Sequence, residues 1–129
     1  MAGTEEKAMT ADELLFFDSK PGLVPIYDAL RTALAERYPE VRIKVAKTQI
    51  SFCNRHLFAM ASLPRRKGES HLLVSFGLGR RESSGRVMQA VEPYPGRWTH
   101  HLLIASPAEI DDELMDWVRE AASFAEGKR

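Results

Sequence analysis

Apolar and polar residues alternate from Val41 to Leu78, which is typical of β-strands joined by short turns. Three apolar runs, 41–52, 57–63 and 70–78, are separated by segments rich in charged and turn-forming residues. Residues two apart in a strand share one face. The third run has such an apolar row, formed by Leu72, Val74, Phe76 and Leu78. The pattern therefore predicts an antiparallel meander of three strands.

The first of these runs changes phase near Ala46 and Lys47. Ile43 and Val45 are in phase with each other, whereas the next set is shifted by one residue and consists of Thr48, Ile50 and Phe52. A β-bulge at this point would restore a single buried face. Bulges are enriched near functional sites, so Lys47 and Thr48 become candidate site residues. The alternative is a bulge that only curves the sheet.

Helical periodicity predicts two main helices. Apolar residues recur at steps of three and four from Leu23 to Tyr38, and again over 107–124. The second helix is preceded by a capping-box pattern at Ser106, Pro107 and Glu109, which predicts its start. A shorter helix is predicted over 10–17, because Thr10 and Glu13 have the same capping spacing.

Residues 98–105 predict a fourth strand, with one face formed by Trp98, His100, Leu102 and Ile104. The preceding segment, 79–97, contains three glycines and two prolines and predicts a long covering loop. We therefore expect an α+β fold: a two-layer sandwich in which an antiparallel sheet of four to five strands packs against the two main helices. Residues 1–9 are expected to form a flexible tail, and 10–129 a single domain.

Composition predicts a soluble, cytoplasmic protein. The single cysteine excludes an intramolecular disulfide within one copy of the chain and favours a reducing compartment. The acidic N-terminus lacks the basic and apolar regions of a signal peptide. No apolar run approaches the roughly 20 residues that span a bilayer, so no membrane partner is expected.

Charge is unevenly distributed, although the chain as a whole is neutral. Residues 1–40 contain four basic and eight acidic side chains, 41–105 contain eleven and three, and 106–129 contain three and seven. A basic sheet beside acidic helices would attract anionic partners. The alternative is that the helices and the sheet loops neutralise one another across the fold.

These observations favour a small non-enzymatic binding module with a basic sheet and loop surface for an anionic ligand, either a nucleic acid or an acidic protein. The ligand-binding residues predicted for it are Lys47, Thr48, Arg55, Arg65, Arg81, Trp98 and His100. The alternative is a small-molecule or metal-handling protein, or an enzyme, with a cleft around Lys47, Thr48 and His100 under the 79–97 loop. The sequence leaves open whether the chain forms a homodimer.

No catalytic residue, metal ligand or cofactor is assigned. The chain has neither the Gly-x-Ser-x-Gly nucleophile pattern nor a P-loop. Cys53 and His56 supply only two of the four ligands of a structural zinc site. The acidic residues at 111–116 lie near the start of the predicted helix, where the helix dipole favours acids.

The segments KTQISF and THHLLIASPAEIDDELMDWVREA carry a resemblance to a known family. From about Leu14 to Glu126 the chain resembles the bacterial family of domain of unknown function 5655. The positions that match its pattern are Lys47, Thr48, Phe52, Phe58, Trp98, Thr99, His100, Ser106, Asp111, Asp112, Glu113, Leu114 and Trp117. The resemblance implies a compact α/β layout, similar to YdhG-like and frataxin-like folds, and it implies no established activity. The frataxin-like comparison implies that the acidic residues at 111–116 could present carboxylates to iron, as an alternative to their role at the helix start.

Overall fold

A computed structural model of the chain describes residues 9–63 and 70–127, which form a six-stranded antiparallel sheet and three α-helices. The strands are β1 (Arg42–Val45), β2 (Ile50–Cys53), β3 (Leu57–Ser62), β4 (Leu72–Leu78), β5 (Gln89–Tyr94) and β6 (Arg97–Ile104). The α-helices are α2 (Ala11–Phe16), α3 (Val24–Arg37) and α4 (Asp112–Glu126), and two 3-10 turns cover Pro21–Leu23 and Pro107–Glu109.

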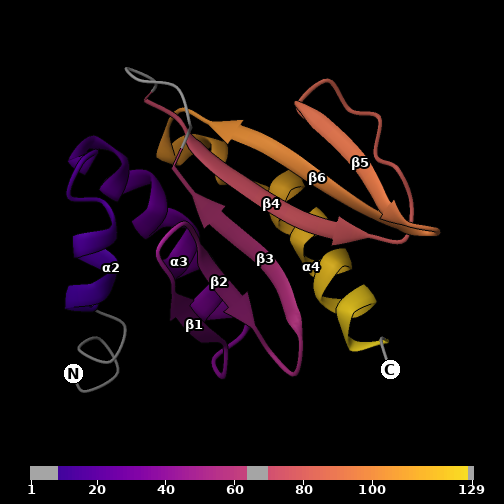
Figure 1. The fold of residues 1–129 in the computed structure, drawn as a ribbon, viewed down its shortest axis with the longest axis horizontal. Coiled ribbons are helices and arrows are strands. Elements are labelled where there is room, and N and C mark those ends of the chain that lie inside the picture. Colours follow the sequence, from indigo (N-terminus) through magenta and orange to yellow (C-terminus); the bar gives the residue numbers. More distant parts are fainter. Residues whose placement is uncertain (1–8, 64–69, 128–129) are drawn as a thin grey trace.

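The strand order is β1-β2-β3-β4-β6-β5, with every pair antiparallel. Helices α3 and α4 cover one face of the sheet, and α2 stands beside the β1 edge (Figure 1). The predicted α+β class is thus confirmed, whereas the expected number of four to five strands is too low. The sequence located four strands. The two additional strands come from residues 41–52, which form two strands, and from residues 79–97, which contain β5.

The core lies between the sheet and the two long helices. The predicted apolar row of β4 is confirmed, because its members are at most 1% exposed. The predicted stripe of α3 is also buried, at Leu23, Ile26, Tyr27, Leu30 and Leu34. Pro25 is accommodated in the first turn of α3, where a backbone N–H has no partner within the helix. Helix α4 packs on β3 and β4 and closes the core.

The first correction concerns residues 41–52, which form a hairpin and not one bulged strand. The backbone N–H of Ala46 donates to the carbonyl of Gln49 at 2.9 Å, and Val45 pairs with Ile50. The phase change in the apolar pattern is therefore a chain reversal. Lys47 and Thr48 lie in the turn between β1 and β2.

The second correction concerns the predicted loop 79–97, whose second half is strand β5. Pro95 and Gly96 form the turn into β6, and Gly96 has a φ of 75°, which glycine adopts at little cost. Proline normally argues against a strand, because it cannot donate to the ladder. Pro93 is tolerated because β5 is at the edge of the sheet.

The third correction concerns the start of α4. The Ser106 side chain makes no capping hydrogen bond, and 107–109 form a separate 3-10 turn in which the Glu109 carboxylate accepts from the backbone N–H of Ala105. The cap of α4 is Asp111, whose side chain accepts from the backbone N–H of Leu114 at 3.0 Å. The predicted capping box is wrong because the chain leaves helical geometry at Ile110, with ψ at 78°. The other predicted capping box, at Thr10 and Glu13, is confirmed.

Candidate functional site: a pocket on the open face of the sheet

The sheet face opposite α3 and α4 carries a row of mostly polar residues, and we call it the open face. The register aligns one residue from each strand in this row: Lys44, Ser51, Met60, Ser75, His101 and Gln89. The adjacent row points to the helices and includes Phe52, Phe76 and His100. Because side chains alternate along a strand, neighbouring residues of β6 belong to different environments.

A pocket of about 530 Å³ lies on the open face, at the end of the sheet that holds the β1–β2 turn. Its size is within the range of small-molecule sites. It is lined by Phe16, Lys47, Thr48, Gln49, Met60, Ser62, Leu63, Leu73, Ser75 and His101. Three strands form its floor, the β1–β2 turn supplies one wall, and the end of α2 supplies Phe16.

A serine and a histidine face each other across β4 and β6 in this pocket. Ser75 and His101 are register partners, and Ser75 Oγ lies 2.7 Å from His101 Nδ1. Burial lowers the pKa of His101 below its ordinary value, so the ring is neutral near pH 7. No other hydrogen bond to this ring is present among residues 9–63 and 70–127. Its Nε2 is therefore the ring nitrogen that can interact with a ligand.

The other polar contribution to the pocket comes from the β1–β2 turn. Lys47 and Thr48 are exposed, and within the described part of the chain Lys47 has no ion-pair partner. Beside them, the Gln49 amide donates to Ser51 Oγ at 3.1 Å. No aspartate or glutamate is among the described residues that line the pocket. Lys47 therefore gives the pocket a positive charge, with no carboxylate among the described lining residues.

The structure does not gather the remaining predicted site residues here. Arg55 lies in the β2–β3 turn, at the opposite end of β2 from Lys47, and its backbone N–H donates to Glu126. Trp98 pairs with Leu78 at that same far end, with the guanidinium of Arg81 5.8 Å from its ring centroid. Arg65 lies outside the described residues.

His100 is on the helix-covered face and is fully buried, so it does not share a cleft with Lys47 and Thr48. Its ring stacks on Phe76 at a centroid distance of 5.5 Å. Its Nε2 accepts from the backbone N–H of Glu82 at 2.9 Å, which requires an unprotonated Nε2. Burial is the main cause that lowers the pKa of His100 and keeps the ring neutral. The histidine of the pocket is the next residue, His101.

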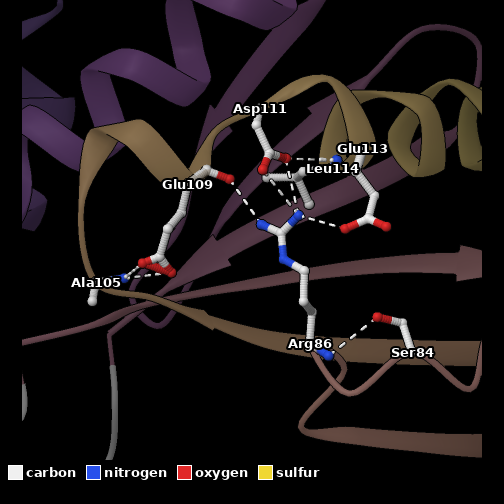
Figure 2. A network of polar contacts seen from close by, with 7 residues as sticks. All are labelled: Ser84, Arg86, Ala105, Glu109, Asp111, Glu113 and Leu114. Carbon is white, nitrogen blue, oxygen red and sulfur yellow. Dashed lines mark hydrogen bonds and ion pairs between the residues drawn. The ribbon is translucent and has the colours of Figure 1, made fainter.

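Two arginines of the predicted basic surface are paired with nearby carboxylates, most of them at or in α4. Arg80 binds Glu82 and Glu120, each at 2.8 Å. Figure 2 shows the guanidinium of Arg86 between the carboxylates of Asp111 and Glu113 and the Glu109 carbonyl, at 2.8 to 3.0 Å. These contacts attach residues 79–88 to α4, at its start through Arg86 and in its second half through Arg80, and use the charges that would otherwise attract an anion.

Three of the four acids at 111–116 have contacts within the protein. Asp111 caps α4 and Glu113 pairs with Arg86, whereas Asp116 lies 3.7 Å from Arg119. Across residues 9–63 and 70–127, no three His, Cys, Asp or Glu side chains are grouped so that they could hold a metal ion. The same residues include no helix with the length and apolar character needed to cross a bilayer.

A second cavity, of about 380 Å³, lies where the ends of α3 and α4 meet the β2–β3 turn. Its lining includes two cations, Arg37 and Arg119, and the carboxylate of Glu126. None of the described residues that the sequence singled out for binding lines it. We therefore take the open-face pocket as the candidate site.

A buried polar network, which the sequence analysis missed, holds α2 in place. The Glu13 carboxylate is 1% exposed, and it accepts hydrogen bonds from the Tyr27 hydroxyl and, at 2.9 Å, from Arg31 Nε. Burial raises the pKa of Glu13, but hydrogen bonds from Thr10, Tyr27 and Arg31 outweigh it and keep the pKa below its ordinary value. The one available signal was the four-residue spacing of Tyr27 and Arg31 on the buried stripe of α3. By fixing α2, the network places Phe16 beside the pocket.

The chain matches the model of a protein family. A family model described as "Domain of unknown function (DUF5655)" matches residues 15–125. No curated protein and no solved structure matches the chain. The frataxin-like layout therefore stays a prediction.

Proposed function

We propose that this chain, which belongs to the family of domain of unknown function 5655, is a small binding module whose open-face pocket takes an anionic small molecule. The observation that carries the proposal is the charge of the pocket. Lys47 provides a cation, Thr48 and Ser62 provide hydroxyls, and no described lining residue is acidic. Phe16, Met60 and Leu73 add apolar surface for the uncharged part of the ligand.

This proposal combines parts of the two functions that the sequence favoured: anion binding from the first and the cleft at Lys47 and Thr48 from the second. A broad basic surface for a nucleic acid or an acidic protein has less support, because Arg80 and Arg86 are paired with carboxylates. Arg55 and Arg81 also lie at the far end of the sheet from Lys47. The cleft around Lys47 and Thr48 is retained, with His101 in place of His100 because adjacent strand residues face opposite sides.

The test uses octanoate as the anionic probe and octanol as its neutral analogue, each titrated into the protein and followed by NMR. We expect octanoate to bind more tightly than octanol. Lys47→Met keeps the aliphatic stem and removes the charge, so it should weaken octanoate about tenfold and leave octanol unchanged, as expected for a lost hydrogen bond between charged groups.

The matched control is Lys44→Met. Lys44 is an exposed lysine on the same face but does not line the pocket. Its replacement removes the same charge from the protein and should leave octanoate affinity unchanged. Equal losses in the two variants would indicate general attraction by net charge and would contradict a site at Lys47.

We also propose that this binding takes place in the cytoplasm of a bacterial cell. The bacterial family that the sequence resembles supports the source, and a single unpaired cysteine supports a reducing compartment. Cys53 is 7% exposed, which suits a thiol with a packing role.

A further inference from the structure

The two polar ends of the open-face pocket are far apart. Lys47 and Thr48 precede β2, whereas His101 lies on β6, and β3 and β4 separate these two strands. Neighbouring strands lie about 4.8 Å apart, so β2 and β6 are separated by roughly 14 Å. This backbone separation favours an extended ligand, which spans the pocket from the β1–β2 turn to His101, over a compact anion such as acetate or phosphate.

The surface between these ends is largely apolar. Met60 on β3 and Leu73 on β4 lie in the middle of the pocket floor, and Leu63 and Phe16 line its sides. Desolvating this surface favours a ligand with a hydrocarbon or aromatic middle.

The end of the pocket at His101 can form a hydrogen bond with an uncharged ligand group. The Ser75 hydroxyl can donate or accept, so His101 Nδ1 can be either the acceptor or the donor of their 2.7 Å contact. The Nε2 of a neutral ring then has the opposite role, either donor or acceptor. A ligand hydroxyl fits both cases, because it can donate and accept. Ser75 is 4% exposed and acts here by orienting the ring.

We infer that the ligand is an elongated, two-ended molecule: its anionic head binds Lys47 and Thr48, its apolar middle lies over Met60 and Leu73, and a neutral hydrogen-bonding group at its other end contacts His101 Nε2. An ω-hydroxy acid with a medium-length chain has this chemistry. The inference rests on the proposed function, because it requires that the anionic end bind at Lys47.

The experiment compares unbranched ω-hydroxy acids, from hydroxybutanoate to hydroxydodecanoate, with the alkanoates of the same chain lengths. Binding is followed through the imidazole NMR signals, which are few because the chain has four histidines. We expect the hydroxyl to weaken binding of short chains, which leave it in the apolar middle. At the length that reaches His101 it should strengthen binding about fivefold. The His101 signals should shift, and those of His100 should not.

Three variants separate the two ends. His101→Leu should abolish the advantage of the hydroxyl, measured in each variant as the ratio of hydroxy-acid affinity to alkanoate affinity. His101→Gln keeps a side-chain donor and acceptor and should retain part of this ratio. Lys47→Met should weaken the hydroxy acid and the alkanoate by the same factor. A thermal melt of each variant verifies that it is folded.

Each other outcome contradicts a stated part of the proposal. If alkanoates bind through Lys47 but the hydroxyl gives no advantage at any length, the two-ended ligand is wrong and the anion pocket stands. If the hydroxyl still strengthens binding in His101→Leu, the ligand hydroxyl does not contact His101, and that part of the proposal is wrong. If no acid in the series binds the folded protein, or if Lys47→Met has no effect, the proposed function fails as well.

Discussion

The two faces of this sheet can be compared at adjacent residues of one strand, His100 and His101. His100 faces the helices, is fully buried, stacks on Phe76 and accepts from a loop backbone N–H. His101 faces the other way, is half-buried, contacts Ser75 and lines a pocket. The same side chain thus fixes a loop on one face and is available to a ligand on the other. The two histidines differ because α3 and α4 cover only the face of the sheet on which His100 lies (Figure 1).

The comparison separates residues that hold the fold from those that are free to bind. On the helix-covered face a side chain is surrounded by other side chains, so its replacement changes stability first. On the open face the polar row is only partly covered, and replacement there should change binding with little effect on stability. The predictions below test this separation, beginning with the largest expected effect.

The largest loss of stability is expected in α2, which stands beside the β1 edge of the sheet. Glu13→Ala removes the carboxylate that binds Tyr27 and Arg31, and it should lower the free energy of unfolding by about 3–5 kcal/mol, as for a broken buried ion pair. Because α2 carries Phe16, octanoate binding should weaken too. Chemical denaturation measures the first effect and NMR titration the second. A loss below about 1 kcal/mol would contradict a structural role for the network.

The same network predicts the direction of a pH effect. The pKa of Glu13 in the fold lies below its ordinary value of 4.5, so its ionisation stabilises the folded state. This contribution is fully present above pH 4.5 and is lost as the pH falls through the lowered pKa. Glu13→Gln removes the titrating group at nearly constant volume and should flatten the dependence of the unfolding free energy on pH in this acidic window.

A smaller effect, and the most direct test of the comparison, comes from two adjacent leucines of β4. Leu72 is fully buried on the helix-covered face, whereas Leu73 is half-buried and lines the pocket. Leu72→Ala should lower the free energy of unfolding by about 3 kcal/mol through the cavity it leaves. Leu73→Ala should lower it by about 1 kcal/mol and weaken octanoate. Equal losses of stability would mean that the open face is covered as well as the other.

The sequence predicts those elements whose apolar residues follow one period throughout. The stripes of α3 and α4 and the buried row of β4 repeat regularly, and each lies where the pattern predicts. Two elements were missed for different reasons. The β1–β2 turn, Ala46–Gln49, contains no glycine, proline or asparagine, so its phase change also fits a bulge. Strand β5 contains Pro93, which only an edge position permits, and sequence does not reveal which strand is at the edge.

The candidate site was predicted in part. Lys47 and Thr48 were proposed because the apolar pattern breaks there, which was interpreted as a bulge, and both residues line a pocket in the structure. The partner histidine was placed one residue too early, at His100. The alternation of side chains along β6 shows that His100 shares a face with the apolar residues. It does not show that the helices leave the other face, that of His101, open to a ligand. Ser75 was missed because its contact depends on the β4–β6 register, which pairs residues 26 positions apart.

The smallest effect concerns the cap of α4, which covers one face without touching the pocket. Asp111→Ala removes the hydrogen bond to Leu114 and the contact with Arg86, and should lower the free energy of unfolding by about 1 kcal/mol. Ser106→Ala, at the position that the sequence favoured, should change it by less than about 0.5 kcal/mol. Denaturation midpoints distinguish the two variants, and the reverse order would restore the capping box at Ser106.

Asp111→Ala also completes the comparison of the faces when it is paired with Lys47→Met. The cap variant weakens the helical cover and leaves every described lining residue of the pocket unchanged, so its affinity for octanoate should equal that of the parent protein. Lys47→Met should do the reverse, with stability within about 0.5 kcal/mol of the parent and octanoate affinity reduced. If both variants changed stability and binding together, the faces would be coupled, and the open face would be part of the same packed unit as the helices.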